Sequence, residues 1–234
     1  SIQNSGNKVW VIDATPSEST TYNGATIIHI NIDSNKKGVI KFVKFYKRTK
    51  KLIQSMPSDI LIAGDLYSLP SIVFSSKKRK LIYDSREIYT QLAGLANKQK
   101  YQYFWSLIEK ICIKKVDCTI VTTISDGEYL YKKYGDLQLS TIYNYPSITF
   151  FKRHSKETLR QQFNLSKIKK ILLYQGKLFK GRGLYQMIDI AKAESNYIVV
   201  FIGDGDIKDS LKAYASRHKV AKQVLFLGAV QYGD

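Results

Sequence analysis

Short apolar runs alternate with helix-like stretches along almost the whole chain of 234 residues. The runs are rich in β-branched residues and nearly continuously apolar, which is typical of strands covered on both faces in a parallel sheet. The sequence therefore predicts an α/β protein with a doubly wound architecture. The predicted strands are 8–13, 25–30, 59–64, 80–84, 118–123, 140–144, 169–176, 197–203 and 223–228, and the predicted helices are 37–55, 66–76, 98–116, 125–134, 183–194 and 206–217.

The segment 145–168 interrupts this alternation. It contains Pro146 near its start, has no strand run, and separates six predicted strands from three. Such a break is typical of a domain boundary, which we place near residue 150. Residues 1–150 are then expected to form one α/β domain and residues 151–234 a second, incomplete one.

Composition narrows the class of protein. A hydrophobic content of 44% can form a substantial core. No apolar run approaches the ~20 residues of a membrane span, and the polar start SIQNSGNK differs from a secretion signal. Cys112 and Cys118 lie in apolar contexts typical of reduced core thiols, and the three histidines are scattered, without a metal-binding motif. A soluble or peripheral cytoplasmic protein is expected.

Basic residues are concentrated in the first part of the chain. The formal net charge is +18, and residues 36–51 alone hold eight basic residues and no acidic one. A charge run is usually a solvated face, but one of this density also favours a polyanionic partner, either a membrane surface or nucleic acid. Each cation can contribute up to ~1 kcal/mol near anionic lipid.

The basic stretch has the pattern of an amphipathic helix. Val39, Phe42, Val43 and Tyr46 recur at helical spacing and are predicted to be buried. The candidate membrane-binding residues on the remaining face are Lys41, Lys44, Lys47, Arg48 and Lys51, preceded by Lys37.

Residues 172–184, LLYQGKLFKGRGL, have the pattern of a phosphate-binding turn. A buried strand leads into Gly176, and two further glycines open the next predicted helix. Glycines allow close backbone approach, and a helix N-terminus attracts anions through its free amides and dipole. Lys177 and Arg182 stand beside this turn and are the candidate phosphate ligands. The alternative is an ordinary strand-to-helix turn with two solvated cations.

A second glycine turn, Gly203, Asp204 and Gly205, also joins a predicted strand to a predicted helix. A GxG turn alone is weak evidence for a ligand site, and a simple turn with an N-terminal acidic residue explains the pattern nearly as well.

Asp84, Arg86 and Glu87 close the fourth predicted strand, where side chains of an open α/β sheet reach the ligand crevice. Arg86 and Glu87 are the candidate catalytic residues: Arg86 could bind an anionic acceptor or the donor phosphate, and Glu87 could orient it. The alternative is a surface ion pair at the strand end. Ser125 and Glu128 match a helix capping box, which is a structural role.

Taken in order, these segments resemble the retaining glycosyltransferases of family 4. The matching stretches are SDILIAGD, LIYDSREIY, WSLIEK followed by KKVDCTIVTTISDGEYLYKKYG, STIYNYP, LLYQGKLFKGRGL, VVFIGDGDIKDSLKAYA and QVLFLGAV, which together span about residues 58–230. The resemblance implies the GT-B fold, in which two Rossmann-like domains face a cleft. Residues 1–150 would be the acceptor-side domain and residues 151–234 part of the domain that binds the nucleotide-sugar donor. The turn Gly203, Asp204 and Gly205 resembles the family's second glycine turn, which lies under the nucleoside.

The chain departs from the family pattern in three respects. It opens near the family's second strand, and it stops before the pair of glutamates that holds the donor sugar and ribose in the family, so a fragment that is inactive alone is expected. Arg86 stands where relatives often carry a histidine. Lys177 and Arg182 have the spacing of the family's diphosphate-binding Arg and Lys, in reversed order.

Our leading hypothesis is a glycosyltransferase, retaining by resemblance, that transfers a sugar from a nucleotide-sugar donor to a membrane-associated glycan or lipid-linked acceptor. The transition state develops negative charge on the leaving diphosphate, which Lys177, Arg182 and the turn amides can stabilise. No metal cofactor is then expected, and the expected location is the cytoplasmic face of the membrane.

The alternative is a non-catalytic basic α/β module that binds nucleic acid or another anionic polymer. The aromatic cluster YQYFW at 101–105 argues against it. These rings belong to a predicted core helix, whereas rings that stack on bases usually lie on an exposed sheet or groove.

Overall fold

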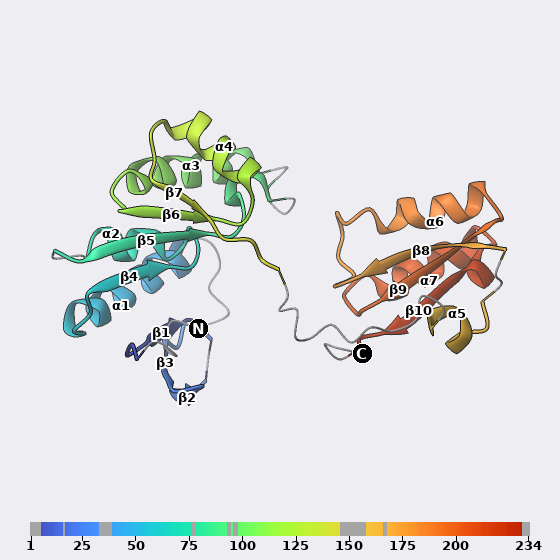
Figure 1. The fold of residues 1–234 in the computed structure, drawn as a ribbon, viewed down its shortest axis with the longest axis horizontal. Coiled ribbons are helices and arrows are strands. Elements are labelled where there is room, and N and C mark those ends of the chain that lie inside the picture. The colour runs from blue at the N-terminus through green and yellow to red at the C-terminus, as the bar shows by residue number, and fades with distance from the viewer. Residues whose placement is uncertain are drawn as a thin grey trace. The chain divides into compact units, whose positions relative to one another are not determined.

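The computed structural model describes residues 6–15, 17–32, 39–75, 78–92, 95, 98–145, 158–165 and 168–230. The chain divides into two compact units, Ser1–Asn144 and Tyr145–Asp234, a few residues before the boundary predicted near residue 150. Both units combine helices with parallel strands (Figure 1), which confirms the predicted α/β fold class.

The main sheet of unit 1 has four parallel strands. Its order is β4 (Ile60–Ala63), β5 (Lys80–Ser85), β6 (Cys118–Val121) and β7 (Leu139–Thr141). The helices of this unit are α1 (Val39–Ser55), α2 (Leu69–Val73), the short 3₁₀ helix η2 (Tyr89–Gln91), α3 (Gln99–Ile113) and α4 (Ile124–Tyr134).

One face of this sheet carries the core of unit 1. Alternate strand residues such as Leu81, Tyr83 and Val121 are buried and cluster with buried residues of all four α-helices. Successive strand residues point to opposite faces, so the other face carries Ile60 and Ile62, which are exposed. The apolar runs predicted strands covered by helices on both faces of the sheet. In unit 1, the buried residues of the four described α-helices all cluster on one face of the main sheet.

A smaller sheet completes unit 1. β1 (Trp10–Asp13) pairs with β3 (Ala25–His29) in parallel, and β2 (Thr20–Tyr22) pairs with β3 as an antiparallel hairpin. The hairpin turns at Asn23 and Gly24, both with positive φ, as a two-residue Asn-Gly turn requires. β2 was not among the predicted strands, although this dipeptide was the signal for it.

The strands of unit 1 therefore form two sheets rather than one. β1 and β4 each lie at the edge of their own sheet. A doubly wound domain usually has one continuous sheet. Among the described residues of unit 1, no strand pairs with both β1 and β4, so the two sheets are not joined by hydrogen bonds.

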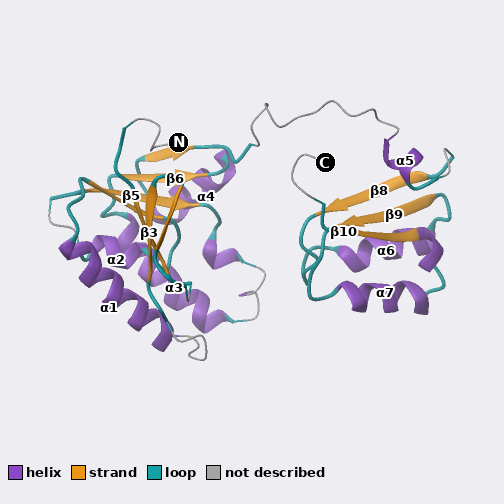
Figure 2. Ribbon diagram, turned by 90° about the horizontal axis from the view of Figure 1, so that it is seen from below, coloured by secondary structure: helices purple, strands orange, loops and turns teal. Residues whose placement is uncertain are grey.

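Unit 2 is a three-stranded parallel sheet with helices. The strand order is β10 (Val224–Gly228), β9 (Tyr197–Ile202), β8 (Lys170–Gln175), and the helices are α5 (Thr158–Gln162), α6 (Leu184–Ala193), α7 (Lys208–Arg217) and the 3₁₀ helix η5 (Ala221–Gln223). Figure 2 shows α6 and α7 on the same face of this sheet, where Val199 and Phe201 of β9 are fully buried.

Helix α4 begins slightly earlier than its sequence pattern predicts. Thr123 is the N-cap residue, and its hydroxyl accepts a hydrogen bond from the Asp126 amide at 3.1 Å. The predicted capping box at Ser125 and Glu128 is therefore wrong, because Ser125 already lies inside the helix. The cap is a threonine followed by aspartate three residues later.

Cys112 is buried and Cys118 half-buried, and both are free thiols, as predicted. Burial raises the pKa of Cys112 to about 11. No helix within the described residues is long and apolar enough to cross a membrane.

A buried carboxylate ties three elements of unit 1 together. Glu109 of α3 is fully buried and accepts hydrogen bonds from the Tyr83 hydroxyl at 3.2 Å and from the Tyr134 hydroxyl. Burial, together with the nearby carboxylate, raises the pKa of both phenols far above the usual value, so they remain donors. The Lys133 ammonium lies 3.7 Å from the same carboxylate.

We predict that Glu109→Ala destabilises unit 1 by about 3–5 kcal/mol, because it leaves buried partners of a charged group unsatisfied. Both tryptophans of the chain, Trp10 and Trp105, lie in unit 1, so urea unfolding followed by tryptophan fluorescence reports on this unit. Glu128→Ala on the exposed face of α4 is the control and should stay within about 0.5 kcal/mol. Equal unfolding midpoints for the two variants would contradict the assigned role of Glu109.

Candidate functional site

The chain leaves β8 through a turn that only glycine adopts easily. Gly176 has φ of 141°, a region that L side chains rarely enter. Its amide donates to the Ile202 carbonyl at 2.9 Å, which holds the turn against the end of β9. The predicted glycine turn therefore starts at the carboxyl edge of the sheet, where ligands of open α/β sheets bind.

Two leucines fix the ends of the loop that follows. Leu178 and Leu184 are buried in the core of unit 2. Between them, Lys180 and Arg182 are exposed and Phe179 is half-buried. Lys177, which precedes Leu178, is exposed as well. The Lys177 ammonium lies 5.2 Å from the centre of the Phe179 ring. Within the described residues Arg182 has no hydrogen bond or ion pair, so its guanidinium is available to a ligand.

The loop ends at the start of α6. Gly183 is the N-cap residue and lies in the left-handed region with φ of 72°. The first amides of any helix have no partner within the helix, and the dipole makes this end positive. The start of α6 thus combines free amides with the nearby cation Arg182, which is the arrangement an anionic phosphate requires.

The two predicted glycine turns contact each other. A Cβ at Gly203 would lie 2.0 Å from the Gly176 carbonyl oxygen, and one at Gly205 would lie 2.5 Å from the Leu178 carbonyl oxygen. The Leu178 amide donates to the Asp204 carbonyl at 3.0 Å. The backbones of the two turns can approach this closely only because both positions are glycine.

The Asp204 side chain is used within its own turn. One carboxylate oxygen accepts from the Gly205 amide at 2.8 Å, and the other lies 3.1 Å from the Lys208 ammonium. The hydrogen bond from the Gly205 amide, and next the one from Lys208, lower the pKa of Asp204, so this side chain is ionised at neutral pH. These contacts favour the alternative of a simple turn with an acidic residue, although the N-cap residue of α7 is Ile207 and not Asp204. The flanking glycines remain candidates for ligand approach.

Arg86 and Glu87 lie in unit 1, at the carboxyl end of β5, and both are exposed. The Arg86 Nε donates to Asp84 at 2.8 Å, so the predicted alternative of a surface ion pair is present. The Thr122 hydroxyl donates to the Arg86 carbonyl at 3.3 Å, which links this turn to the end of β6.

The basic stretch forms α1, and three of its candidate lysines, Lys41, Lys47 and Lys51, are exposed. Lys44 is half-buried, and the Arg48 guanidinium donates to the Asn31 carbonyl. Lys36 and Lys37 lie outside the described residues. One predicted core position of this stretch is wrong. Val43 is 39% exposed, and the buried positions of α1 include Thr49 and Ile53 instead.

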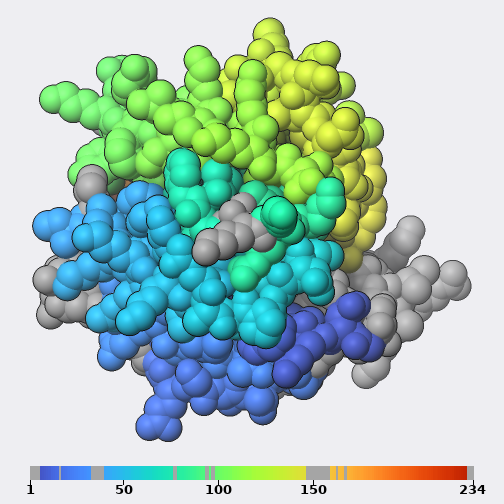
Figure 3. All heavy atoms as spheres, turned by 90° about the vertical axis from the view of Figure 1, so that its left-hand side faces the viewer, coloured from blue at the N-terminus to red at the C-terminus, as the bar shows by residue number. Residues whose placement is uncertain are grey.

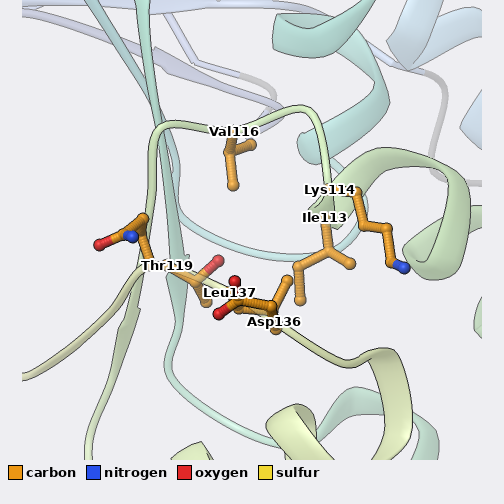
Figure 4. A pocket seen from close by; sticks show the side chains of 7 residues that line it. Ile113, Lys114, Val116, Thr119, Asp136 and Leu137 are labelled. Carbon is orange, nitrogen blue, oxygen red and sulfur yellow. The ribbon is translucent and has the colours of Figure 1, made fainter.

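A small hollow lies away from these groups. It has a volume of about 170 Å³ and is lined by residues of the α3 end, the β6 start and the α4–β7 loop, including Thr119 and Gln138 (Figure 4). It opens at the amino ends of β6 and β7, whereas ligands of open α/β sheets bind at the carboxyl ends. No sequence motif indicated it. Among the described residues, no three metal-ligating side chains gather at any place.

The comparisons with known proteins agree on the fold. Residues 155–234 match the family model "Glycosyl transferases group 1". Sucrose-phosphate synthase from Thermosynechococcus elongatus superimposes with a TM-score of 0.80 at 14% identity, over 99% of this chain and 63% of that one. The chain has a GT-B glycosyltransferase fold.

Other solved glycosyltransferases superimpose as well. Anabaena HepE in complex with UDP-glucose gives a TM-score of 0.61 at 16% identity, over 89% of this chain and 57% of that one. A glycosyltransferase from Rickettsia africae gives 0.61 at 14% identity, over 99% of this chain and 62% of that one. This chain therefore spans about three fifths of the GT-B chains that it resembles. No curated protein sequence matches it.

We predict that Gly203→Ala destabilises unit 2 by more than about 3 kcal/mol, because its Cβ would overlap the Gly176 carbonyl oxygen. Gly183→Ala is the matched control. It has positive φ but nothing within 4 Å of its Cβ, so it should cost only about 1–2 kcal/mol. Hydrogen exchange of the β8, β9 and β10 amides measures the difference. Equal protection in the two variants would contradict the close contact of the turns.

Proposed function

We propose that this chain belongs to a retaining glycosyltransferase of family 4 that transfers a sugar from a nucleotide-sugar donor. The observation that carries the proposal is the contact between the glycine turns at 176–183 and 203–205, beside the start of α6 and two exposed cations. This arrangement lies within the residues that match the glycosyl transferases group 1 model. The superposition on HepE with UDP-glucose supports a nucleotide-sugar as the donor.

The chemistry of the leaving group explains the need for this site. When the bond between sugar and diphosphate breaks, negative charge develops on the diphosphate oxygens. Preorganised cations and amides aimed at that charge lower the barrier. Arg182 can bind two oxygens with its planar fork, whereas Lys177 acts as a point charge. Cations and amides can thus do the work of a divalent metal, so the proposed reaction uses none.

Unit 1 would carry the acceptor. Arg86 and Glu87 lie at the carboxyl edge of its sheet, which is the edge that faces ligands in such folds. Only the Nε of Arg86 is bonded to Asp84, and its exposed position at this edge supports a role in binding an anionic acceptor or the donor phosphate, with Glu87 orienting it. The exposed cations of α1 support a glycan or lipid-linked acceptor at the cytoplasmic face of a membrane. Because the chain spans 63% of sucrose-phosphate synthase, turnover is assigned to the whole protein.

A nucleic-acid-binding module has less support. Trp105, the largest ring of the aromatic cluster at 101–105, is buried and packs edge-on against Phe42 at 4.9 Å between ring centres. A buried ring cannot stack on a base. Tyr101 and Tyr103 are exposed, but they lie on a helix with Leu107 and Ile111 rather than on an open sheet.

We predict that Lys177→Ala and Arg182→Ala each weaken nucleoside diphosphate binding by about 1.5–3 kcal/mol, the cost of one charge-assisted hydrogen bond. Thermal shifts with UDP, GDP and ADP identify the nucleotide, because a ligand that binds only the native state raises Tm. Calorimetric titration of the variants then gives the loss of affinity.

Lys192→Ala is the control for these variants, since Lys192 is exposed in the last turn of α6, at the other end from the turn. It should bind the nucleotide like the unchanged chain. Unchanged affinity in both Lys177→Ala and Arg182→Ala would remove the phosphate assignment.

A further inference from the structure

The outer face of α3 exposes large apolar side chains in a stripe. Tyr103 is 73% exposed, and Leu107 and Ile111 are each 46% exposed. Residues four positions apart lie on the same side of a helix, so the three side chains form one continuous row. The opposite side of α3 carries Trp105, Glu109 and Cys112, which are buried in the core. The stripe is therefore not required for the packing of unit 1.

Lysines flank this stripe without acidic partners. Lys100, Lys110 and Lys114 are exposed on the same side of α3 and make no ion pair with the described residues. The single acidic residue of α3 is Glu109, which is fully buried and bonded within the core. The outer face of α3 thus presents exposed apolar groups and lysines without a negative charge.

Helix α1 extends the same surface. Helix α2 packs against both α1 and α3, and Phe42 of α1 reaches Trp105 of α3 edge-on. α1 exposes Ile40, at 62%, together with Val43, and its sequence contains no acidic residue. In Figure 3 the light blue to cyan atoms, the colours of α1, and the green atoms, the colour of α3, are both visible on the side that faces the viewer. The basic apolar face consists of Ile40, Lys41, Val43, Lys47 and Lys51 of α1 and Lys100, Tyr103, Leu107, Lys110, Ile111 and Lys114 of α3.

We propose that the basic apolar face docks on an anionic lipid surface, with Tyr103, Leu107 and Ile111 entering the boundary between headgroups and acyl chains. Helices that lie in a membrane interface combine an apolar strip with flanking lysines, and tyrosine favours the headgroup level. A second copy of the chain would set lysines against lysines, which repels. Nucleic acid would use the lysines but leave Leu107 and Ile111 against charged phosphates.

This inference deepens the proposal of a membrane-associated acceptor and rests on it. Crossover helices run back from the carboxyl ends of the strands, so α1 and α3 both begin near that edge of the sheet. Val43 and Tyr103 lie in the first turns of these helices. Docking through them would bring the carboxyl edge, with Arg86 and Glu87, close to headgroups that carry a lipid-linked acceptor.

Cosedimentation with vesicles tests the proposal. The unchanged chain should pellet with vesicles that mix phosphatidylcholine and phosphatidylglycerol, and not with phosphatidylcholine alone. Lys110→Glu combined with Lys114→Glu should weaken this binding about tenfold or more. Leu107→Ser combined with Ile111→Ser should leave binding at low salt but abolish it at high salt, because only the apolar contribution resists screening.

Matched controls lie in unit 2. Lys192→Glu and Ile190→Ser change an exposed lysine and an exposed isoleucine of α6 and should bind vesicles like the unchanged chain. Equal pelleting with neutral and anionic vesicles, or no pelleting with either, would overturn the proposal. A chain that does not bind vesicles but retains a single-stranded oligonucleotide would also overturn the proposal, if that retention depends on Lys110 and Lys114 and not on Leu107 and Ile111.

The nucleoside diphosphate thermal shift on the same variants separates this proposal from the proposed function. Variants of α3 that lose vesicle binding should keep the shift, since the candidate phosphate site lies in unit 2. A chain that binds vesicles without any nucleotide shift would refute the donor site alone. A chain that shifts with nucleotide but ignores vesicles would refute the lipid surface alone.

Discussion

Parallel strand pairing is the constraint on which both units depend. Parallel strands need a crossover connection, so a loop follows every strand at the same edge of the sheet. In unit 2 the register of β8, β9 and β10 brings the turns after Gln175 and Ile202 side by side. Their backbones then touch at Gly176 and Gly203, and a Cβ at Gly203 would overlap the Gly176 carbonyl oxygen. The candidate phosphate site is thus a direct consequence of how the strands align.

Charge is distributed differently in the two units. In unit 2, Asp204 is bound to Lys208 and to the Gly205 amide, and Lys177, Lys180 and Arg182 are the exposed cations of the turn at 176–183. In unit 1 the lysines of α1 and α3 surround exposed apolar groups. A compact cluster of cations at glycine turns suits a small polyanion, whereas a broad face of lysines and apolar side chains suits an extended anionic surface. The basic residues of the two units are therefore arranged for different proposed partners, a small polyanion in unit 2 and an anionic surface in unit 1.

Much of the fold could be predicted from the sequence because strands and helices have different hydrophobic periods. The strands at 197–203 and 223–228 appear almost at their predicted positions, as β9 and β10. β2 was missed because Thr20–Tyr22 is short and polar, and only the Asn-Gly turn indicated it. The α4 cap was misplaced because two Ser/Thr-to-acid pairs overlap there, and only the backbone geometry at Thr123 selects one.

For the candidate site, the sequence alone determined which residue types are present: glycines at strand ends, and lysine and arginine at a spacing that suits a diphosphate. It could not determine which of these residues meet. The contact of Gly203 with Gly176 joins residues of different elements, and the row formed by Tyr103, Leu107 and Ile111 depends on which face of α3 is buried. Local patterns fix the period of each element, but only packing decides which side of it faces the core and which residues remain free for a ligand.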